Sequence, residues 1–507
     1  MNTHLLLTLP VAIPLLTLAL CALLRGHPLT QRCASVAGSV ALLAAAIALL
    51  AAVFDGTILA TQFGAWAAPF GITFVADLLS AAMVLVTAVM AVAVSIYALV
   101  DGARERERAF FHPLYHGLLM GVCGSFLTGD LFNLYVWFEI MLISSFGLLV
   151  VGGTRAQLDA GVKYVTLNLV ATTLFLIAVG FLYGLTGTLN LADLARTLPG
   201  VGNQGLVTTL AVMFLLAFGS KAALFPLFFW LPAAYHTASA PVVAIFAALL
   251  TKVGVYAILR TFTLLFTGDA GYTGPVIGAV AVLTMVTGVL GAAAHYDIRR
   301  ILSFHIISQI GYMLVGLAVA TPLALAGSVL YVIHHIVVKA NLFLIAGAMR
   351  VAGGGFDLKA MGGLHRSAPV LALLFAVPAL SLAGVPPLSG FWAKFMVVKS
   401  SLDAGHTVLA GVALAVGVLT LYSMVKIWNE AFWKAPTTAL SAQAAAQWRA
   451  APRKRWAMLV PVAGLAAITL TIGLATEPFV EFSLRAADQL LVPHGYMKAV
   501  LGQEASP

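Results

Sequence analysis

Apolar windows of about twenty residues recur along almost the whole chain, and any fold of the chain must accommodate them. An α-helix of that length crosses the hydrocarbon core of a bilayer. Hydrophobic residues make up 62% of the 507 residues and charged residues only 9%, whereas soluble domains carry about 25% charged residues. A soluble core cannot hold so much apolar surface, so the sequence predicts an all-α polytopic membrane protein.

Read in order, the windows predict fourteen membrane-spanning helices in one integral membrane domain. The first lacks a basic n-region and a cleavage site, so it is expected to be a span rather than a signal peptide. The helices are expected to form three groups, over residues 1–100, 109–266 and 273–433, followed by a last helix and tail over 434–507. The expected limits are 4–24, 33–53, 76–99, 109–128, 131–152, 163–186, 206–231, 240–264, 273–293, 301–320, 324–349, 369–398, 406–433 and 456–476.

The distribution of lysine and arginine predicts the orientation. If the N-terminus is outside, 17 of the 27 basic residues fall in inward-facing loops and five in outward-facing loops and the tail, which are Arg196, Arg260, Lys399, Arg485 and Lys498. The positive-inside rule then places both termini outside. The inward-facing residues are Arg25, Arg32, Arg104, Arg106, Arg108, Arg155, Lys163, Arg299, Arg300, Arg350, Lys359, Arg366, Lys434, Arg449, Arg453, Lys454 and Arg455. Because the basic residues are scattered over many loops, the net charge of +9 does not indicate nucleic-acid binding.

The remaining five basic residues are lysines inside expected spans: Lys221, Lys252, Lys339, Lys394 and Lys426. Each costs about 2.5–3.5 kcal/mol at a helix centre on insertion scales, so an intramembrane lysine indicates function by default. Lys426 lies near a helix end and four residues before Glu430, and it fits equally well a lysine that extends to the interface. The other four lie deeper and predict a path for ions.

Prolines interrupt two of the lysine-bearing spans. They are Pro226 and Pro232 after Lys221 in the seventh span, and Pro378, Pro386 and Pro387 before Lys394 in the twelfth. A proline leaves the carbonyl four residues earlier without its helical donor, and such a carbonyl is tolerated only where it faces protein or water. The freed carbonyls are expected on residues such as Ala222, Leu382 and Ala383. Because a shift of five helices reverses direction across the membrane, two such breaks favour an inverted repeat with an ion site.

One carboxylate and several histidines complete the candidate path. Glu139 is the only carboxylate expected deep in a span, and His335 precedes Lys339 by one helical turn. This neighbouring pair favours a proton relay. His236 follows the second break of the seventh span, whereas His305 and His334 fit buried, hydrogen-bonded histidines equally well.

No cofactor or metal site is predicted. The three cysteines, Cys21, Cys33 and Cys123, form no CxxC motif, and the histidine pair lacks a carboxylate or cysteine to complete a metal shell. "GSK" at 219–221 lacks the glycine-rich loop of a phosphate-binding motif. An ion gradient or a partner protein is therefore expected to drive the chain.

Several stretches resemble the antiporter-like subunits shared by respiratory complex I and the Mrp cation/proton antiporters. They are "DLFNLYVWFEIMLISSFGLL", "SKAALFPLFFWLPAAYHTASAPVVAIFAALLTKVGVY", "HYDIRRILSFHIISQIGYM", "HHIVVKANLFLIAGAM" and "PPLSGFWAKF", and the resemblance covers roughly residues 70 to 430. The chain length and the sequence around Glu139 most resemble the Mrp members that lack a long C-terminal extension.

The resemblance implies fourteen helices with inverted five-helix repeats over helices four to eight and nine to thirteen. It also implies exchange of outside protons for inside Na⁺ or K⁺ in the bacterial cytoplasmic membrane, by a complex of six or seven different subunits. Glu139 would pair with Lys221, and Lys252, His335, Lys339 and Lys394 would continue the path. Lys426 and His305 match no family position with assurance.

Two other functions compete with this one. A proton-pumping subunit of a complex I-like NADH dehydrogenase or a membrane-bound hydrogenase needs the same residues, and only the proteins bound to it differ. A membrane scaffold that carries no ions would tolerate neutralisation of all four central lysines.

The loop between the last two helices tests the orientation. Four of the five basic residues in "KAPTTALSAQAAAQWRAAPRKRW" cluster at 449–455, so we expect this loop to be cytoplasmic. A membrane-impermeant cysteine label or a protease added from the inside should reach it. Reaction only from the outside would reverse the orientation and the direction of the path.

Overall fold

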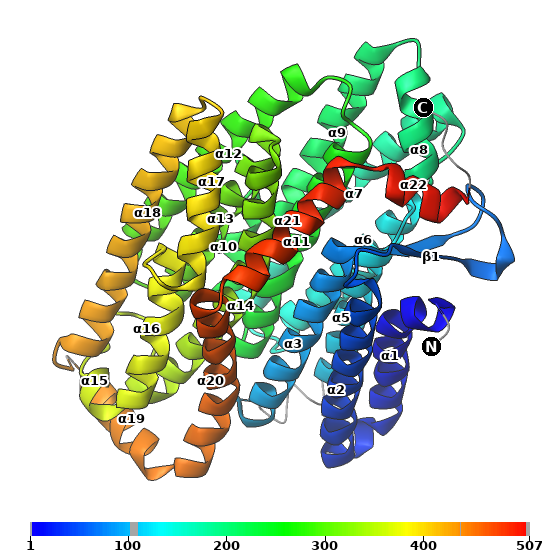
Figure 1. Ribbon diagram of the computed structural model, residues 1–507. Coiled ribbons are helices and arrows are strands. Elements are labelled where there is room, and N and C mark those ends of the chain that lie inside the picture. The colour runs from blue at the N-terminus through cyan, green and yellow to red at the C-terminus, as the bar shows by residue number, and fades with distance from the viewer. Residues whose placement is uncertain (1–2, 102–109, 437, 503–507) are drawn as a thin grey trace.

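The computed structural model describes residues 3–101, 110–436 and 438–502, apart from the side chain of Ala65 (Figure 1). The expected inward-facing residues Arg104, Arg106 and Arg108 lie outside the described residues. The first nine α-helices are α1 Thr3–Leu23, α2 Pro28–Val53, α3 Leu78–Asp101, α5 Phe111–Leu127, α6 Leu131–Val150, α7 Arg155–Thr186, α8 Leu191–Thr197, α9 Gln204–Ala222 and α10 Trp230–Tyr235. The next are α11 Ala240–Leu264, α12 Ala270–Ala294, α13 Ile298–Val319, α14 Pro322–Gly353, α15 Leu364–Ser367, α16 Pro369–Ala383, α17 Ser389–Asp403 and α18 Thr407–Ile427. A π-helical turn, η4 Trp428–Trp433, precedes α19 Ala439–Ala450, α20 Pro452–Leu474, α21 Glu477–Leu491 and α22 His494–Leu501.

Twelve of the described helices are long and apolar enough to cross a membrane. Two of the fourteen expected spans are not among the twelve. The span expected at 109–128 corresponds to α5, which has 17 residues. The span expected at 369–398 consists of two helices, α16 and α17, which leave α-helical structure at Pro386 and Pro387 as the sequence predicted. The expected seventh span is interrupted after Lys221 as predicted, because α9 ends at Ala222 and α10 begins at Trp230.

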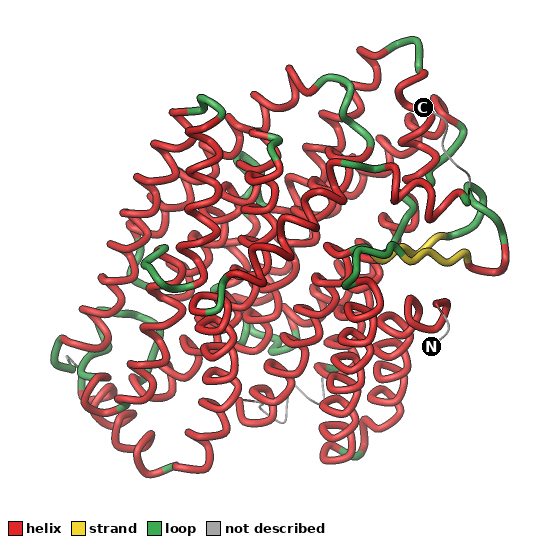
Figure 2. The backbone as a smooth tube through the Cα atoms, in the orientation of Figure 1, coloured by secondary structure: helices red, strands yellow, loops and turns green. Residues whose placement is uncertain are grey.

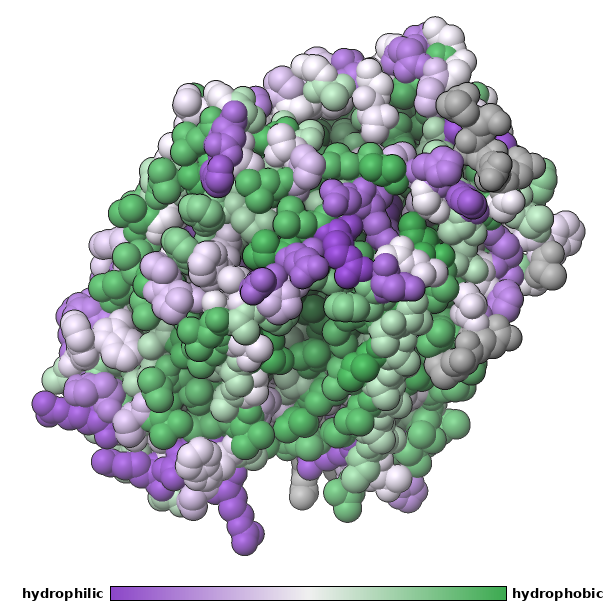
Figure 3. All heavy atoms as spheres, in the orientation of Figure 1, coloured by the Kyte–Doolittle hydropathy of each residue, from purple (hydrophilic) through white to green (hydrophobic). Residues whose placement is uncertain are grey.

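The lysine-bearing helices α11 and α14 lie at the centre of the bundle. All 25 residues of α11 are buried, and α14 packs against α11, α13, α17, α20 and α21. A helix that is apolar all round belongs inside a bundle. The outer helices instead expose apolar side chains, as α7 does with Val162, Val170 and Phe181. Figure 3 shows the resulting broad hydrophobic surface, with hydrophilic side chains gathered at its ends and along α21.

The two termini share one end of the bundle, which we call the terminal face. A two-stranded antiparallel hairpin, β1 Leu59–Gln62 with β2 Thr73–Ala76, lies there and is the one departure from the all-α prediction in the described ranges (Figure 2). His4 contacts Thr61 of the hairpin, and the amide of Gln62 donates to the carbonyl of Val500 at 3.4 Å. The opposite end, which we call the basic face, holds α15 and α19 (Figure 1).

The chain after the last long helix folds back over the bundle. In Figure 1 the red helix α21 runs obliquely across α14 and α11 towards the terminal face. Its buried residues, Ser483, Ala486, Ala487 and Leu490, follow a spacing of three or four residues, so one side packs and the other is polar. The C-terminal segment is therefore part of the packed structure.

Two predictions about charged residues are wrong. Arg260 and Lys399 were expected in loops, but both lie in helices, and Arg260 is only 5% exposed within α11. Glu139 is only partly buried and is not the only deep carboxylate, because Asp77 and Asp101, at the two ends of α3, are buried. Arginine pairs with both: Arg260 with Asp77 at 2.6 Å and Arg350 with Asp101 at 2.8 Å. Charge compensation across helices explains why these groups are tolerated inside.

Candidate functional site

Four buried lysines come from four helices in the interior of the bundle. Lys221 is 4% exposed, Lys252 and Lys339 are fully buried, and Lys394 is 8% exposed. Among the described residues, none of the four lies within 4.0 Å of a carboxylate. Buried lysines without a counter-ion are rare because each charge must be stabilised by neutral dipoles or lost by deprotonation.

The first lysine stands at a break in its helix. Helix α9 ends one residue after Lys221, the segment 223–229 that contains Pro226 is not α-helical, and α10 follows with Pro232 inside it. Ala223 adopts a left-handed conformation (φ 62°), which turns the chain out of the helix. The indole of Trp230 donates to the carbonyl of Ser220 at 2.9 Å, so α10 bonds back to the end of α9.

Glu139 lies on α6, across an aromatic cluster from Lys221. Phe138 and Phe218, from α6 and α9, have ring centroids 6.0 Å apart, and the ammonium of Lys221 is 5.8 Å from the Phe138 ring. No ion pair within 4.0 Å joins Glu139 to Lys221 in the part of the chain that the structure describes, although the two charges interact electrostatically. One carboxylate oxygen of Glu139 is buried without a hydrogen-bond partner. The expected partners are thus brought near each other without direct contact.

A glycine brings the helix of the second lysine against the helix of the first. A Cβ on Gly254 of α11 would lie 2.6 Å from the backbone nitrogen of Ala222, so the two helices touch backbone to backbone at this point. Lys252 lies two residues before Gly254 and Lys221 one residue before Ala222. The ammonium of Lys252 donates to the carbonyl of Ala247 on its own helix.

The third lysine shares α14 with two histidines. Lys339 donates to the carbonyl of Leu302 on α13 at 3.2 Å. His335, one turn earlier, has neither ring nitrogen hydrogen-bonded, and its ring stacks 6.2 Å from that of Tyr331. Lys339 lies within electrostatic range of both Lys252 and Lys394. The structure therefore places His335 and Lys339 between Lys252 and Lys394.

The fourth lysine binds the second helix break. Lys394 donates to the carbonyls of Leu382 and Ala383 at 3.0 and 3.1 Å. These are carbonyls that the sequence predicted to be freed by Pro386 and Pro387, which lie in the segment between α16 and α17. The ammonium also lies 4.7 Å from the Tyr312 ring. Helix-end carbonyls carry a partial negative charge, which stabilises the ammonium.

His334 ties this break to α14. Its Nδ1 lies 2.8 Å from the hydroxyl of Ser389, which lies 2.8 Å from that of Ser381, so the three side chains connect α14, α16 and α17. A Cβ on Gly390 would collide with the carbonyl of Ser381, and only glycine permits this close approach. His334 thus fits the structural role that the sequence allowed for it.

Several other polar side chains in the interior lack partners. Both ring nitrogens of His305 and of His335, both amide atoms of Asn341 and the hydroxyl of Thr251 are buried without hydrogen bonds. Each such group costs about 1–3 kcal/mol if it stays unsatisfied, and native proteins satisfy most of them with protein or ordered water. His305 therefore does not fit the hydrogen-bonded core histidine that the sequence allowed. Among the described residues, no three histidine, cysteine or acidic side chains cluster as metal ligands do.

His236 lies apart from the row, in a polar cavity of about 410 Å³ that also includes Asp159, Lys163, His295 and Arg300. Its Nδ1 donates to the carbonyl of Pro232 at 2.8 Å, and Arg300 approaches Nε2 at 3.4 Å. Burial, and secondarily the charge of Arg300, lower the pKa of His236 and favour its neutral form. The cavity places a titratable group between the α9–α10 break and the basic face.

Lys426 has a different environment from the four lysines of the row. Its ammonium donates to the carbonyls of Ala292, Ala293 and His295, at 3.3, 2.7 and 2.8 Å. These carbonyls surround the C-terminus of α12, where the last four carbonyls of a helix lack donors. Glu430 instead pairs with Lys434, at 2.5 Å. The geometry favours a structural lysine that caps a neighbouring helix.

The sequence reading missed the aromatic bridge within the row. Tyr312 and Tyr331 stack with ring centroids 5.4 Å apart, between Lys394 on one side and His335 on the other. The hydroxyl of Tyr331 donates to the side chain of Gln309. A usable signal was present, because Tyr331 precedes His335 by four residues and so shares its helix face.

Comparisons with known proteins agree with this architecture. Residues 128–420 match the family described as NADH:quinone oxidoreductase/Mrp antiporter, TM. The chain is 46% identical to the D-type Na⁺/H⁺ antiporter subunit of Alkalihalophilus pseudofirmus, over 98% of this chain and 99% of that protein.

Solved structures are similar over nearly the whole length. One chain in the structure of the Mrp complex from Dietzia sp. DQ12-45-1b superposes with a TM-score of 0.92 at 36% identity, covering 99% of this chain and 100% of that one. A chain of respiratory complex I from Thermus thermophilus superposes with a TM-score of 0.78 at 25% identity, covering 97% and 100%. The similarity is thus greater to the Mrp complex.

The capping role of Lys426 is testable by stability. Replacing Lys426 by Met leaves the carbonyls of Ala292, Ala293 and His295 without their donor, and we expect a loss of about 1–3 kcal/mol in the free energy of unfolding. The readout is a lower thermal unfolding temperature of the purified protein in detergent. Lys426→Arg, which keeps charged donors, should lose less. An unchanged unfolding temperature for Lys426→Met would contradict the capping role.

Proposed function

Because the chain belongs to the NADH:quinone oxidoreductase/Mrp antiporter family, within its Mrp D-type branch, we propose that it conducts protons along its buried lysine row while the assembled complex exchanges them for Na⁺ or K⁺. The chain is part of a transporter rather than an enzyme. The observation that carries the proposal is the set of four buried lysines, none within 4.0 Å of a described carboxylate. A scaffold has no need for four such costly groups, each of which destabilises its helix in the membrane.

The finer architecture is part of the proposal. We infer fourteen spans if α5 is counted as one and the α16–α17 pair as another, in addition to the twelve long helices. Inverted repeats of five helices would relate the break after Lys221 to the break before Lys394. In support, the chain leaves α-helical structure at both positions, and a lysine lies beside each.

The environment of Lys221 supports its role as the switch. It is the one lysine of the row whose ammonium donates no hydrogen bond among the described residues, whereas Lys252, Lys339 and Lys394 donate to carbonyls. An ammonium without fixed partners can swing towards Glu139 or towards Lys252. Engagement with the carboxylate stabilises the protonated lysine, and separation favours proton release.

Repulsion along the row couples the protonation of neighbouring lysines. Two ammonium groups ~8 Å apart repel by about 2 kcal/mol at an effective dielectric constant near 20. A proton arriving at Lys252 therefore disfavours a second one on Lys339, which is within electrostatic range of both its neighbours. The unpaired polar atoms of Thr251, His335 and Asn341 lie on the same two helices and are suited to hold water that links the lysines.

We place the basic face in the bacterial cytoplasm and both termini outside, following the excess of basic residues at that end. The cavity around His236 would then open on the cytoplasmic side, close to Pro232 and the break in α9–α10. Protons would travel from the terminal face to this side in exchange for Na⁺ or K⁺. His236, with its pKa lowered, would release protons readily there.

Substitutions at Glu139 separate its charge from its shape. In vesicles that carry the complete complex, Glu139→Gln should lower cation-dependent dissipation of a pH gradient by about 100-fold or more, because a positioned proton-transfer group contributes about 10²–10⁴ in rate. Glu139→Asp keeps the charge and should retain partial activity. Glu139→Gln with Lys221→Met removes both charges, and it should restore assembly without restoring exchange.

A matched control is Asp403→Asn, which neutralises an exposed carboxylate paired with Lys399 on α17. This variant should exchange ions at the wild-type rate. If Glu139→Gln also exchanged at that rate across the pH range, the carboxylate would be a packing residue and the switch would be wrong.

The isolated chain is expected to be inactive. Monovalent cations need several oxygen ligands, but the buried carboxylates Asp77, Asp101 and Asp193 already pair with arginine, which leaves the partly buried Glu139 within a span. A partner protein of the complex is therefore expected to supply part of the cation path. The purified chain in liposomes should show no Na⁺- or K⁺-dependent proton movement, and sustained exchange by the chain alone would contradict this.

A further inference from the structure

A polar row on α11 continues from Lys252 towards the terminal face. Lys252, Tyr256 and Arg260 follow at intervals of four residues, so they lie along one side of the helix, about 6 Å apart along its axis. All three are buried. The lysine row thus has a branch directed to the end of the bundle that holds the termini.

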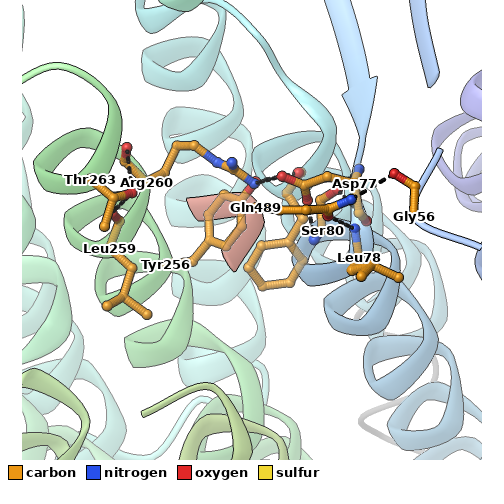
Figure 4. A network of polar contacts seen from close by, with 10 residues as sticks. Gly56, Asp77, Leu78, Ser80, Tyr256, Leu259, Arg260, Thr263 and Gln489 are labelled. Carbon is orange, nitrogen blue, oxygen red and sulfur yellow. Dashed lines mark hydrogen bonds and ion pairs between the residues drawn. The ribbon is translucent and has the colours of Figure 1, made fainter. Parts of the chain in front are cut away.

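A buried ion pair ends this branch (Figure 4). Nη2 of Arg260 lies 2.6 Å from Oδ2 of Asp77, and these side chains are 7% and 2% exposed. The other carboxylate oxygen of Asp77 accepts from the backbone N–H of Ser80 at 2.9 Å. Arg260 also donates to the hydroxyl of Tyr256 at 3.3 Å. The pair is therefore bonded both to α3 and to the next member of the row.

The C-terminal segment covers the pair. The ring of Tyr496, on α22, lies 5.2 Å from the guanidinium of Arg260 and is itself 3% exposed. Gln489, on α21, accepts from the backbone N–H of Leu78 at 3.0 Å and donates to the carbonyl of Gly56 at 2.8 Å. Residues after the last long helix thus contact Arg260 on one side of the ion pair and the backbone next to Asp77 on the other.

Arginine cannot serve as a relay group, because its guanidinium does not release its proton in proteins. A fixed positive charge beside a proton path instead repels each arriving proton. When Asp77 is engaged, the pair is neutral overall, and it fills the end of the row with two side chains that are bonded to each other. A pair in this position blocks passage in its closed state and admits protons only when its two charges separate.

We propose that the Asp77–Arg260 pair, covered by α21 and α22, is the barrier that closes the terminal-face end of the proton path on α11. Protons pass between Lys252 and the terminal face when the pair opens. This inference rests on the proposed function of the lysine row. The other charged or titratable groups near the pair are Tyr256 on α11, Tyr496 on α22 and, at the start of α6, Asp130, which interacts electrostatically with Tyr496.

The competing explanation is that the Asp77–Arg260 pair only links two helices and plays no part in proton passage. A second aspartate–arginine pair in the chain provides a control for this explanation. Asp101, at the other end of α3, pairs with Arg350 of α14 at 2.8 Å, at the basic face. The same two residue types thus join α3 to a lysine-bearing helix at each end. Of the two pairs, only Asp77–Arg260 lies at the end of the polar row that runs along α11 from Lys252.

Proton leak without cations distinguishes the two explanations. The complete complex is reconstituted in liposomes, and the decay of an imposed pH gradient is followed in buffer free of Na⁺ and K⁺, per assembled complex. Asp77→Asn with Arg260→Gln removes both charges, and we expect the leak to rise by about tenfold or more as the barrier falls. Asp101→Asn with Arg350→Gln should leave the leak at the wild-type level. The charge exchange Asp77→Arg with Arg260→Asp should bring the leak back towards the wild-type level.

Further variants keep the test decisive. If the neutral double variant does not assemble, Tyr496→Ala keeps both charges and removes only the covering ring, and it should also raise the leak. A wild-type leak in whichever of these variants assembles overturns the barrier, and so does an equal rise in the Asp101 control. Lys252→Met tests the row separately. Normal cation-dependent exchange by Lys252→Met overturns the proposed relay, whereas the leak measurement decides the barrier in either case.

Discussion

The burial of positive charge without a neighbouring carboxylate governs this structure. A lysine in the bundle interior must either bind dipoles strongly enough to stay protonated or give up its proton. Lys394 binds two carbonyls at the end of α16, and Lys339 and Lys252 each bind one. The end of α16 supplies the oxygens for Lys394, whereas Lys339 and Lys252 bind backbone carbonyls within α13 and α11. None of these contacts adds negative charge. These three ammonium groups are thus stabilised by backbone dipoles rather than by a counter-ion, and the proposed proton transfer depends on this arrangement.

Close contacts between backbones set the geometry of the row. Gly254 lets α11 touch α9 beside Lys221, and Gly390 lets the start of α17 touch the end of α16 beside Lys394. A larger residue at Gly254 would push apart α9 and α11, which carry Lys221 and Lys252. A larger residue at Gly390 would push α17, which carries Lys394, away from α16. The two helix breaks differ in one respect, because Lys394 is fixed by the carbonyls at its break whereas Lys221 donates no described hydrogen bond. The end of the row near Glu139 is therefore the more adjustable one.

The sequence predicted what depends on local patterns. The length of the apolar windows predicted the twelve long helices. The stereochemistry of proline predicted the interruptions after Lys221 and before Lys394 and the freed carbonyls of Leu382 and Ala383. The pairing of Asp77 with Arg260 could not be read in this way, because it joins residues 183 positions apart on helices whose contact depends on the whole bundle. Its individual signals were nevertheless present. Arg260 lies inside the span expected at 240–264, and Asp77 opens an otherwise apolar helix.

The hydrogen bonds of the ammonium groups distinguish lysines that cannot be told apart from the sequence alone. Lys426 and Lys252 are each one charge in a long apolar helix, yet Lys426 donates to three carbonyls at a helix end whereas Lys252 bonds to a single carbonyl of its own helix. Three charge-assisted bonds hold an ammonium firmly in place, because each is about twice as strong as a neutral one. A lysine held in this way contributes stability and is poorly suited to release a proton. The number of dipoles around each ammonium, more than its depth, thus divides structural lysines from those suited to transfer protons.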